Sequence, residues 1–227
     1  QVDPSIKQVI GGVHATLDSD ILNSLTSIDY SIQREGEEAF LALVEKRDPK
    51  KIPGVVSRSN NTLFKTGIAP VIKDINILPM PEREKFWGIP ESERKHVDVS
   101  YVNTIRGCPY KCTYCASPFH WDRKTTRLRT PESVMEEMRY LKEHHYVTPK
   151  FDYAASANID SKESMKIEDN TIVYFVDDVF TVNKKRVKKL LRMMIDEKLD
   201  MKWKCEARAD HLDDEVCELM AEAGCER

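Results

Sequence analysis

The sequence predicts an α/β protein, because short apolar runs alternate with amphipathic helical stretches along most of its 227 residues. A second observation is that polar candidate site residues directly follow predicted strands, at the edge where parallel α/β sheets bind ligands. A third is a polar stretch with closely spaced prolines at residues 77–95, where neither helix nor strand pairing is favoured. This stretch predicts a division into two domains.

The first 82 residues predict a parallel sheet covered on both sides. Asp18 stands before a periodic apolar run and is expected to cap a helix. The hairpin of this part has its predicted turn at residues 60–61, an Asn-Asn pair. The predicted elements are a buried strand that runs into a glycine turn within residues 8–16, a strand at 28–32, helices at 18–25 and 36–45, and a hairpin at 54–65.

The second half of the chain, from about Val97, repeats strand–helix units. Gly224 is expected to end the last helix. Residues 149–170 are polar and without a clear period, which predicts an exposed insertion. The predicted elements are helices at residues 131–144, 184–199 and 212–223, and strands at 173–176 and 202–206.

Composition limits the classes of function. Hydrophobic residues make up 41% of the chain and charged residues 32%, which is typical of a globular protein with its own core. The formal net charge of −3 gives the chain no overall positive potential that would attract nucleic acid or an anionic membrane. We find no signal-peptide pattern and no 18-residue apolar run, so we expect no membrane span and a reducing, cytoplasmic location for the six cysteines.

Three of the cysteines, Cys108, Cys112 and Cys115, fall within eight residues. A C-x3-C-x2-C loop can place three thiolates on one face of a metal centre, one short of the four that close an ordinary iron–sulfur cluster. One iron would then remain open to a small molecule. Zinc is the structural alternative, with His120 completing a Cys3His set. Spacing alone leaves iron–sulfur and zinc equally open, whereas disulfides lack the support of an oxidising compartment.

The cysteine spacing, with Tyr114 just before the third cysteine, resembles the signature of the radical S-adenosylmethionine (radical SAM) superfamily. Residues 172–181 and 203–212 resemble the second and third barrel strands of its cobalamin-binding branch, and residues 122–124 and 127–132 resemble that branch's lead into the first barrel helix. The resemblance covers most of the chain and identifies it as an internal fragment of such an enzyme.

The resemblance implies a fold with two domains and a linker between them. Residues 1–82 are expected to be the C-terminal part of a Rossmann-like cobalamin-binding domain, and residues 83–97 a linker. Residues 98–227 are expected to form the N-terminal half of a radical SAM partial (β/α)6 barrel, with 149–170 as its insertion.

The resemblance also implies cofactors. Cys108, Cys112 and Cys115 are expected to bind a four-iron, four-sulfur cluster, whose open iron chelates S-adenosylmethionine and passes it the electron that yields a 5′-deoxyadenosyl radical. The ring of Tyr114 is expected to pack against the adenine of S-adenosylmethionine. Packing beside the cluster is the structural alternative for this ring.

In the family, the end of the second barrel strand approaches the amino group of S-adenosylmethionine. Asp177 and Asp178 occupy that position, and a carboxylate suits an ammonium group, but the sequence does not choose between them. The structural alternative is an N-cap of the next helix, for which Thr181 and Asn183 are better placed.

Glu206 and Arg208 lie at the C-terminal end of the third barrel strand. Arginine binds carboxylates through a planar pair of donors, so Arg208 is a candidate to hold the carboxylate of a substrate. A salt bridge to a nearby acid is its structural alternative.

Gly11 and Gly12 follow the first strand and allow a bulky ligand to approach the backbone. In the resembling family such a pair flanks the nucleotide tail of cobalamin. His14 is not assigned to cobalt, because the family's cobalt-ligating histidine lies further upstream. Residues 36–37 resemble half of the family's Gly-Glu-Gly-Glu turn, whereas residues 34–35 are Arg-Glu.

The remaining cysteines, Cys205, Cys217 and Cys225, lack ligand spacing and are expected to be small buried residues, with a second cluster as the alternative. The basic helix at residues 184–192 has apolar residues at helical spacing, which favours a packed apolar stripe with a solvated basic face over a nucleic-acid site.

The first functional hypothesis is a cobalamin-dependent radical SAM enzyme that methylates or rearranges an unactivated carbon in a biosynthetic pathway. Its expected partners are a small-molecule or lipid substrate and a one-electron donor such as flavodoxin or ferredoxin. An RNA methylthiotransferase-like protein would need three more cysteines, and residues 1–107 contain none. A zinc-binding interaction module would be colourless and fold only with zinc, whereas the radical SAM interpretation predicts a brown, oxygen-sensitive protein.

Overall fold

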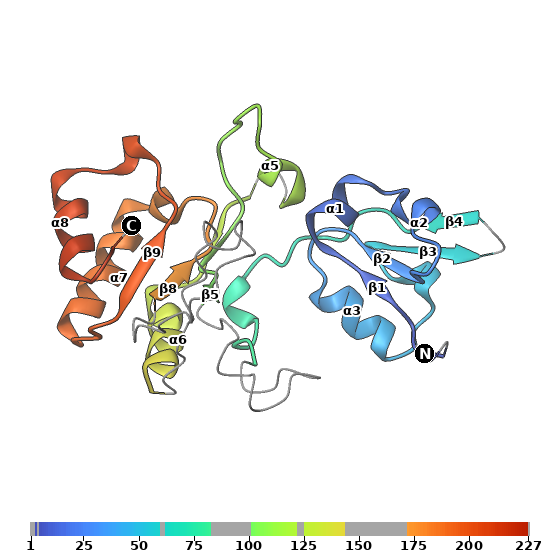
Figure 1. Cartoon of the computed structure of the whole chain (residues 1–227), viewed down its shortest axis with the longest axis horizontal. Coiled ribbons are helices and arrows are strands. Elements are labelled where there is room, and N and C mark those ends of the chain that lie inside the picture. The colour runs from blue at the N-terminus through green and yellow to red at the C-terminus, as the bar shows by residue number, and fades with distance from the viewer. Residues whose placement is uncertain are drawn as a thin grey trace, which may run out of the picture. The chain divides into compact units, whose positions relative to one another are not determined.

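The computed structural model describes residues 3, 5–59, 62–82, 101–121, 125–143 and 172–226 (Figure 1). The chain divides into two compact units. Unit 1 consists of Gln1–Lys73 and Gly107–Arg127, and unit 2 of Asp74–Arg106 and Leu128–Arg227. The cysteine triplet therefore belongs to the same unit as the N-terminal sheet.

Unit 1 contains a four-stranded sheet in the order β1-β2-β3-β4. Only β1 and β2 are parallel, while β3 runs antiparallel to both β2 and β4. The β3–β4 pair is the predicted hairpin, which always joins antiparallel neighbours. The prediction of a parallel sheet was wrong for the β2–β3 pair. The strands are β1 (Val9–Ile10), β2 (Tyr30–Ile32), β3 (Val55–Ser59) and β4 (Thr62–Lys65).

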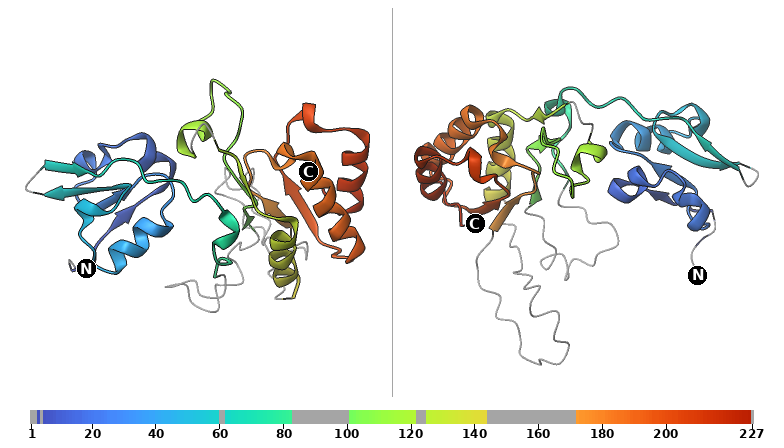
Figure 2. Two further views of the ribbon diagram at one scale, coloured as in Figure 1. Left: turned by 180° about the vertical axis from the view of Figure 1, so that it is seen from behind. Right: turned by 90° about the horizontal axis from the view of Figure 1, so that it is seen from above.

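Apolar side chains cover both faces of this sheet, as predicted. Val55 and Val56 are adjacent on β3 and point to opposite faces. Val55 packs with Ala39 and Ala42 of α3, whereas Val56 packs with Leu22 of α2. Figure 2 shows the ribbon from two further directions. The helices of the unit are α1 (Gly12–Leu17), α2 (Ile21–Ser24), α3 (Glu37–Val44) and α5 (Ser117–His120), with a short 3-10 helix η1 (Pro49–Lys51).

The helix predicted at residues 18–25 is shorter than expected. It contains only four residues, and a separate helix, α1, starts directly after the first strand. Asp18 does not cap α2, because its carboxylate accepts a hydrogen bond of 2.9 Å from the backbone of Asp20, one residue before the helix. Residues with short polar side chains often form such local turns in competition with a helix.

Unit 2 contains a three-stranded parallel sheet in the order β5-β8-β9. The predicted strand–helix repeat is confirmed, although β8 and β9 end one residue earlier than expected. The strands are β5 (Tyr101–Val102), β8 (Ile172–Phe175) and β9 (Lys202–Cys205), and the helices are α6 (Pro131–Glu143), α7 (Lys184–Asp196) and α8 (Asp214–Glu222), with short 3-10 helices η2 (Ile75–Ile77), η4 (Phe180–Val182) and η5 (Ala209–His211).

One face of this sheet packs against all three helices. Phe175, Phe180 and Trp203 form an aromatic cluster with ring centres 4.9 to 5.5 Å apart. Asn183 and Asp213 cap α7 and α8 by accepting hydrogen bonds from backbone N–H groups of the first helical turn. The apolar core thus fixes the helices on one side and leaves the strand ends for polar side chains.

Where the chain passes from one unit to the other, it forms a two-stranded sheet of β6 (Ile105–Arg106) and β7 (Arg127–Leu128). The cysteine segment runs from the end of β6 to the start of β7. The predicted linker at residues 83–97, the insertion at 149–170 and the hairpin turn at 60–61 all lie outside the described residues, so the domain boundaries stay a prediction.

Candidate metal and cofactor site

The three predicted metal ligands lie on one loop of unit 1. Cys108, Cys112 and Cys115 are half-buried thiols, and the backbone N–H of Cys115 donates to the carbonyl of Cys112 at 3.1 Å. The turn at the start of the loop requires glycine: Gly107 has φ +96°, and a Cβ there would lie 2.4 Å from the carbonyl oxygen of Thr125.

The donor set fits a cluster in kind and number, since three thiols of one loop are what a cluster with one open iron needs. In the part of the chain that the structure describes, no three His, Cys, Asp or Glu side chains converge on one point. The three thiols are therefore close in sequence, but their side chains are not arranged around a common metal position. His120, the fourth zinc ligand of the alternative interpretation, lies on α5 with its ring centre 4.6 Å from that of Trp121.

Tyr114 is 90% exposed. Its ring is therefore available to a ligand. Packing of this ring beside the cluster, the structural alternative, stays a prediction. Its contact with adenine stays a prediction.

The two acids after β8 differ completely in environment. Asp177 is 1% exposed, and its carboxylate accepts hydrogen bonds from the backbone N–H groups of Thr104 (2.6 Å) and Ile105 (2.9 Å) and from the Thr104 hydroxyl (2.5 Å). Burial raises the pKa of Asp177 to about 6, against the opposing effect of these donors. Asp178 is exposed.

Asp177 therefore belongs to the buried interior of unit 2. The carboxylate joins the end of β8 to the segment between β5 and β6, where several backbone donors need an acceptor. Asp178 is the acid whose side chain reaches solvent. As predicted, Asn183 rather than either acid caps the next helix.

Arg186 supports the same segment from α7. Its Nε donates to the carbonyl of Arg129 at 2.7 Å and its Nη2 to the carbonyl of Thr104 at 3.3 Å, while burial lowers the pKa of Arg186 to about 10. The sequence analysis missed this residue. A lone arginine within a basic helix carries no signal that separates it from its solvated neighbours.

Glu206 and Arg208 both have partners within the chain. Tyr174 donates to Glu206 at 2.8 Å, and Arg208 makes two 3.0 Å hydrogen bonds to the carboxylate of Asp210. The structural alternative for Arg208 is thus observed. This ion pair is exposed, so it is weak and leaves Arg208 able to exchange partners.

The glycine pair after β1 is exposed. Gly12 has φ +89°, and a Cβ at this position would meet nothing within 4 Å among the described residues, so open space lies above the start of α1. A bulky cofactor can approach the backbone here, which is the fit that the predicted cobalamin contact requires. His14 is exposed on the same helix. Arg34 adopts φ 63°, a conformation that glycine takes at no cost.

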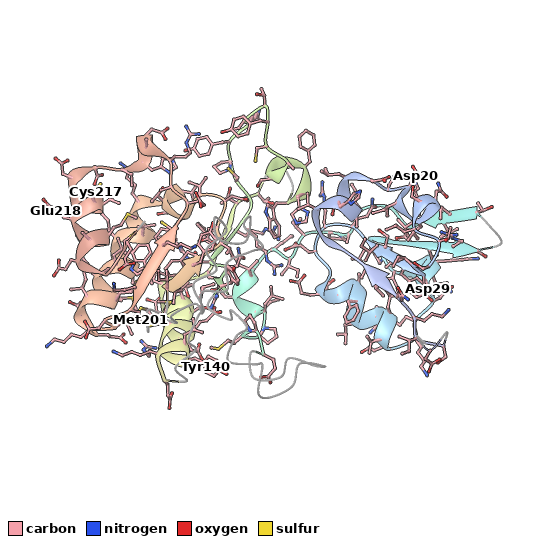
Figure 3. All side chains as sticks on the ribbon, viewed as in Figure 1. Asp20, Asp29, Tyr140, Met201, Cys217 and Glu218 are labelled. Atoms are coloured by element: carbon pink, nitrogen blue, oxygen red, sulfur yellow. The ribbon has the colours of Figure 1, made fainter. Side chains whose placement is uncertain are left out.

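The other cysteines only partly match the prediction. Cys205 and Cys225 are half-buried against the core of unit 2, and their side chains are hydrogen-bonded to each other, which raises the pKa of Cys205. Cys217 is exposed on the outer side of α8, contrary to the prediction of a buried residue (Figure 3). Its neighbour Val216 is the buried residue of this helix, and each step along a helix turns the side chain by about 100°.

The basic helix α7 is a packed and salt-bridged element, as predicted. Val187, Leu190 and Leu191 are buried. Its lysines and arginine form ion pairs with acids of α6 and α8, among them Lys188 with Glu215. In the described residues, no helix is long and apolar enough to cross a membrane.

Residues 102–151 match the model of the radical SAM superfamily. Over 229 residues the chain is 28% identical to the uncharacterized methyltransferase PH0819 of Pyrococcus horikoshii, which covers 99% of this chain and 44% of that protein. It is also 28% identical over 160 residues to the anaerobic magnesium-protoporphyrin IX monomethyl ester cyclase of Cereibacter sphaeroides, covering 65% of this chain and 25% of the cyclase.

Among solved structures, the chain is similar to the radical S-adenosylmethionine methyltransferase TsrM of Kitasatospora setae, a structure with cobalamin and a [4Fe-4S] cluster bound. The TM-score is 0.66 at 19% identity, covering 96% of this chain and 40% of TsrM. This likeness confirms a mixed α/β fold of the kind found in cobalamin-dependent radical SAM enzymes. The chain spans less than half the length of each of these proteins.

Proposed function

We infer a function for this chain from its membership of the radical SAM superfamily, whose model residues 102–151 match. In this proposal it is part of a cobalamin-dependent radical SAM enzyme that methylates or rearranges an unactivated carbon in biosynthesis. The observation that carries the proposal is the loop of Cys108, Cys112 and Cys115, three half-buried thiols in eight residues within the matched range.

The three thiolates would bind a four-iron, four-sulfur cluster. Together with S-adenosylmethionine, such a cluster supplies a 5′-deoxyadenosyl radical by reductive cleavage of a carbon–sulfur bond. The chain's own tasks are to fix the loop, through Gly107 at its entry and the turn from Cys112 to Cys115, and to hold the substrate of that cleavage.

For S-adenosylmethionine, Asp178 is the better candidate of the two acids. Its carboxylate is exposed after β8, whereas the oxygens of Asp177 already accept hydrogen bonds from Thr104 and Ile105. The exposed ring of Tyr114 would stack on the adenine. Glu206 and Arg208, at the end of β9, would contact the polar groups of S-adenosylmethionine or of the substrate.

For cobalamin, we assign the open surface at Gly11 and Gly12. Residues 1–82 would then correspond to the C-terminal part of a Rossmann-like cobalamin-binding domain, and residues 98–227, with the cysteine loop and the β5-β8-β9 sheet, to the N-terminal half of a partial (β/α)6 barrel. The methyltransferase name of PH0819 and the ring-forming reaction of the cyclase set the range of reactions, methyl transfer or rearrangement.

The proposal includes the remaining partners and the location. The substrate is a small molecule or a lipid, and the electron comes from a one-electron donor of the flavodoxin or ferredoxin type. Because a cluster with an open iron is destroyed by oxygen, we expect an oxygen-sensitive protein in the reducing cytoplasm.

The test is anaerobic purification with reconstitution, followed by iron, sulfide and zinc analysis and electron paramagnetic resonance after reduction. About four irons per chain, with a reduced-cluster signal that changes when S-adenosylmethionine is added, is the expected result. About one zinc per chain without a cluster signal would refute the proposal.

Two matched substitutions then decide which of the two acids, Asp177 or Asp178, contacts S-adenosylmethionine. Asp178→Asn should keep the iron content but lose the spectral change on addition of S-adenosylmethionine. Asp177→Asn should retain that change whenever the protein folds, because its carboxylate faces the backbone. The reverse result would exchange the two roles.

A further inference from the structure

Glu35 and Arg127 form a buried ion pair inside the unit that contains the three cysteines. Nη1 of Arg127 lies 2.6 Å from Oε2 of Glu35, and the two side chains are 4% exposed in Glu35 and 6% exposed in Arg127. Glu35 stands between β2 and α3, whereas Arg127 is the first residue of β7, where the cysteine loop ends. The pair therefore ties the end of this loop to the N-terminal sheet of the same unit.

The backbone at Ile72 completes the junction. Nη1 of Arg127 also donates to the carbonyl of Ile72 at 2.8 Å, and the N–H of Ile72 donates to Oε2 of Glu35 at 2.9 Å. Three segments that are far apart in the sequence thus meet at two side chains. Each contact is directional, so the position of Arg127 is specified as well as stabilised.

The loop is also closed at its base. The backbone of Gly107 approaches the carbonyl of Thr125 so closely that a Cβ would clash, and Thr125 lies two residues before Arg127. Fixing Arg127 therefore fixes the base from which the cysteines project. Farther along the loop, α5 lies against α1 of the same unit.

Stability alone does not account for this pair. Nε and Nη2 of Arg127 are buried without a hydrogen-bond partner among the described residues. Unpaired buried donors lose their hydration without compensation, and apolar residues of similar size often replace a buried ion pair at no cost in stability. An ion pair of this kind serves better to define one arrangement than to raise stability.

We propose that Glu35 is a positioning residue: through Arg127 and the contact of Thr125 with Gly107, it fixes the base of the cysteine loop and so the placement of the three thiols. The inference rests on the proposed function, because it takes these thiols to be cluster ligands. It assigns Glu35 no contact with the cluster or with a substrate.

The first measurement uses the full chain without metal. In a double variant, Glu35→Met with Arg127→Met, hydrogen exchange followed by mass spectrometry should become about tenfold faster or more in residues 107–127, with exchange in β3 and β4 unchanged. Glu35→Asp, which keeps the charge and withdraws the carboxylate, should give a smaller change in the same region. Glu45→Gln, which breaks the exposed pair with Arg47 in the same unit, is the control and should change neither region.

The second measurement is anaerobic reconstitution of the same variants. The double variant should bind less than about half of the wild-type iron, and its reduced-cluster signal should be altered, while its melting temperature stays near that of the wild type. Glu35→Asp should give intermediate values of both iron content and signal.

Unchanged exchange together with unchanged iron would overturn the proposal. Equal loss of protection in residues 107–127 and in β3 and β4, in both the double variant and Glu35→Asp, would also overturn it, since that result marks a general structural role. A wild-type chain that binds no iron would instead refute the proposed function, while the exchange data would still decide whether the pair positions the loop.

Discussion

The hydroxyl of Tyr174 donates a hydrogen bond of 2.8 Å to Oε1 of Glu206, from the middle of β8 to the residue after β9. Nζ of Lys204 lies 4.4 Å from the centre of the Tyr174 ring. These side chains stand on the face of the sheet opposite the aromatic core, since Phe175 and Trp203 alternate with them along the strands. The carboxylate of Glu206 is thus oriented by a strand residue before any ligand arrives.

This contact predicts a pKa change. Burial raises the pKa of Tyr174 to about 12, and the hydrogen bond to Glu206 acts in the same direction. In Glu206→Gln, the pKa of Tyr174 should fall but stay above its ordinary value, because burial remains. Titration of ¹³Cζ-labelled tyrosine by NMR measures it. Glu226→Gln, which removes an acid paired with Lys202, is the control, and an unaltered titration in Glu206→Gln would show that the hydrogen bond is not formed in solution.

Asp177 predicts a pH dependence of stability. Its pKa of about 6 in the folded protein lies above the ordinary value of 3.8, so the folded state binds the proton more tightly. Its contribution to stability is therefore complete below about pH 4 and is lost as the pH rises through 6. Between these limits the unfolding free energy should fall by up to about 3 kcal/mol. Urea denaturation from about pH 4 to about pH 7 measures the slope.

The matched variant is Asp177→Asn, which does not titrate. Its unfolding free energy should vary less with pH, because its amide oxygen can accept from the N–H groups of Thr104 and Ile105 while the side chain carries no charge. An identical slope in wild type and variant would assign the pH dependence to other groups.

The backbone at Gly107 leaves no room for a side chain at the start of the cysteine loop. Gly107→Ala places a methyl group against Thr125 and also strains a positive φ, so we expect a loss of about 3 kcal/mol or more and poor cluster assembly. Gly67 provides the control, because it has φ +84° and a Cβ added there would meet no described atom within 4 Å. Gly67→Ala should cost only about 1 kcal/mol. Thermal unfolding compares the two, and equal losses would exclude the clash.

The burial of Trp203 predicts how much the aromatic cluster contributes to the stability of unit 2. Its side chain is fully buried, and its Nε1 donates to the carbonyl of Ala223 at 2.8 Å. Trp203→Ala should destabilise by about 4 kcal/mol, and Trp203→Phe by about 2 kcal/mol, because the second keeps much of the packing but leaves the carbonyl unpaired. Urea denaturation distinguishes the two, and similar values would show that the hydrogen bond dominates.

The cysteines outside the loop should differ in reactivity. Cys217 is exposed, whereas Cys205 is half-buried with a raised pKa and a hydrogen bond to Cys225. Brief alkylation with iodoacetamide, mapped by peptide mass, should label Cys217 first. Equal labelling of Cys205 would show that unit 2 opens on the time scale of the reaction.

Much of unit 2 could be predicted from the sequence, because its strands and helices follow regular apolar periods. Its helices α7 and α8 also begin at capping residues, Asn183 and Asp213. The direction of β3 could not be predicted, since strand pairing depends on contacts between distant segments rather than on local pattern. The same reason hid the junction of Glu35 with Arg127, which are 92 residues apart.

At the site, local sequence was enough to find the three cysteines, whose spacing is itself the signal. It was not enough to separate Asp177 from Asp178. The two have the same chemistry, and only the path of the chain after Phe175 decides that one is enclosed and the other exposed. The burial of Arg186 could not be predicted either, because the sequence does not distinguish a buried arginine from a solvated one.

Unit 1 is built from two stretches of chain, Gln1–Lys73 and Gly107–Arg127, with part of unit 2 between them. During synthesis its sheet leaves the ribosome early, but the last contacts of the unit form only after residue 127 has emerged, by which time the first strand of unit 2 has been made. The two units therefore cannot mature strictly one after the other. Nor can a single proteolytic cut release unit 1 by itself: a cut between residues 73 and 107 separates the sheet from the loop that carries the cysteines, and a cut after residue 127 leaves residues 74–106 of unit 2 attached.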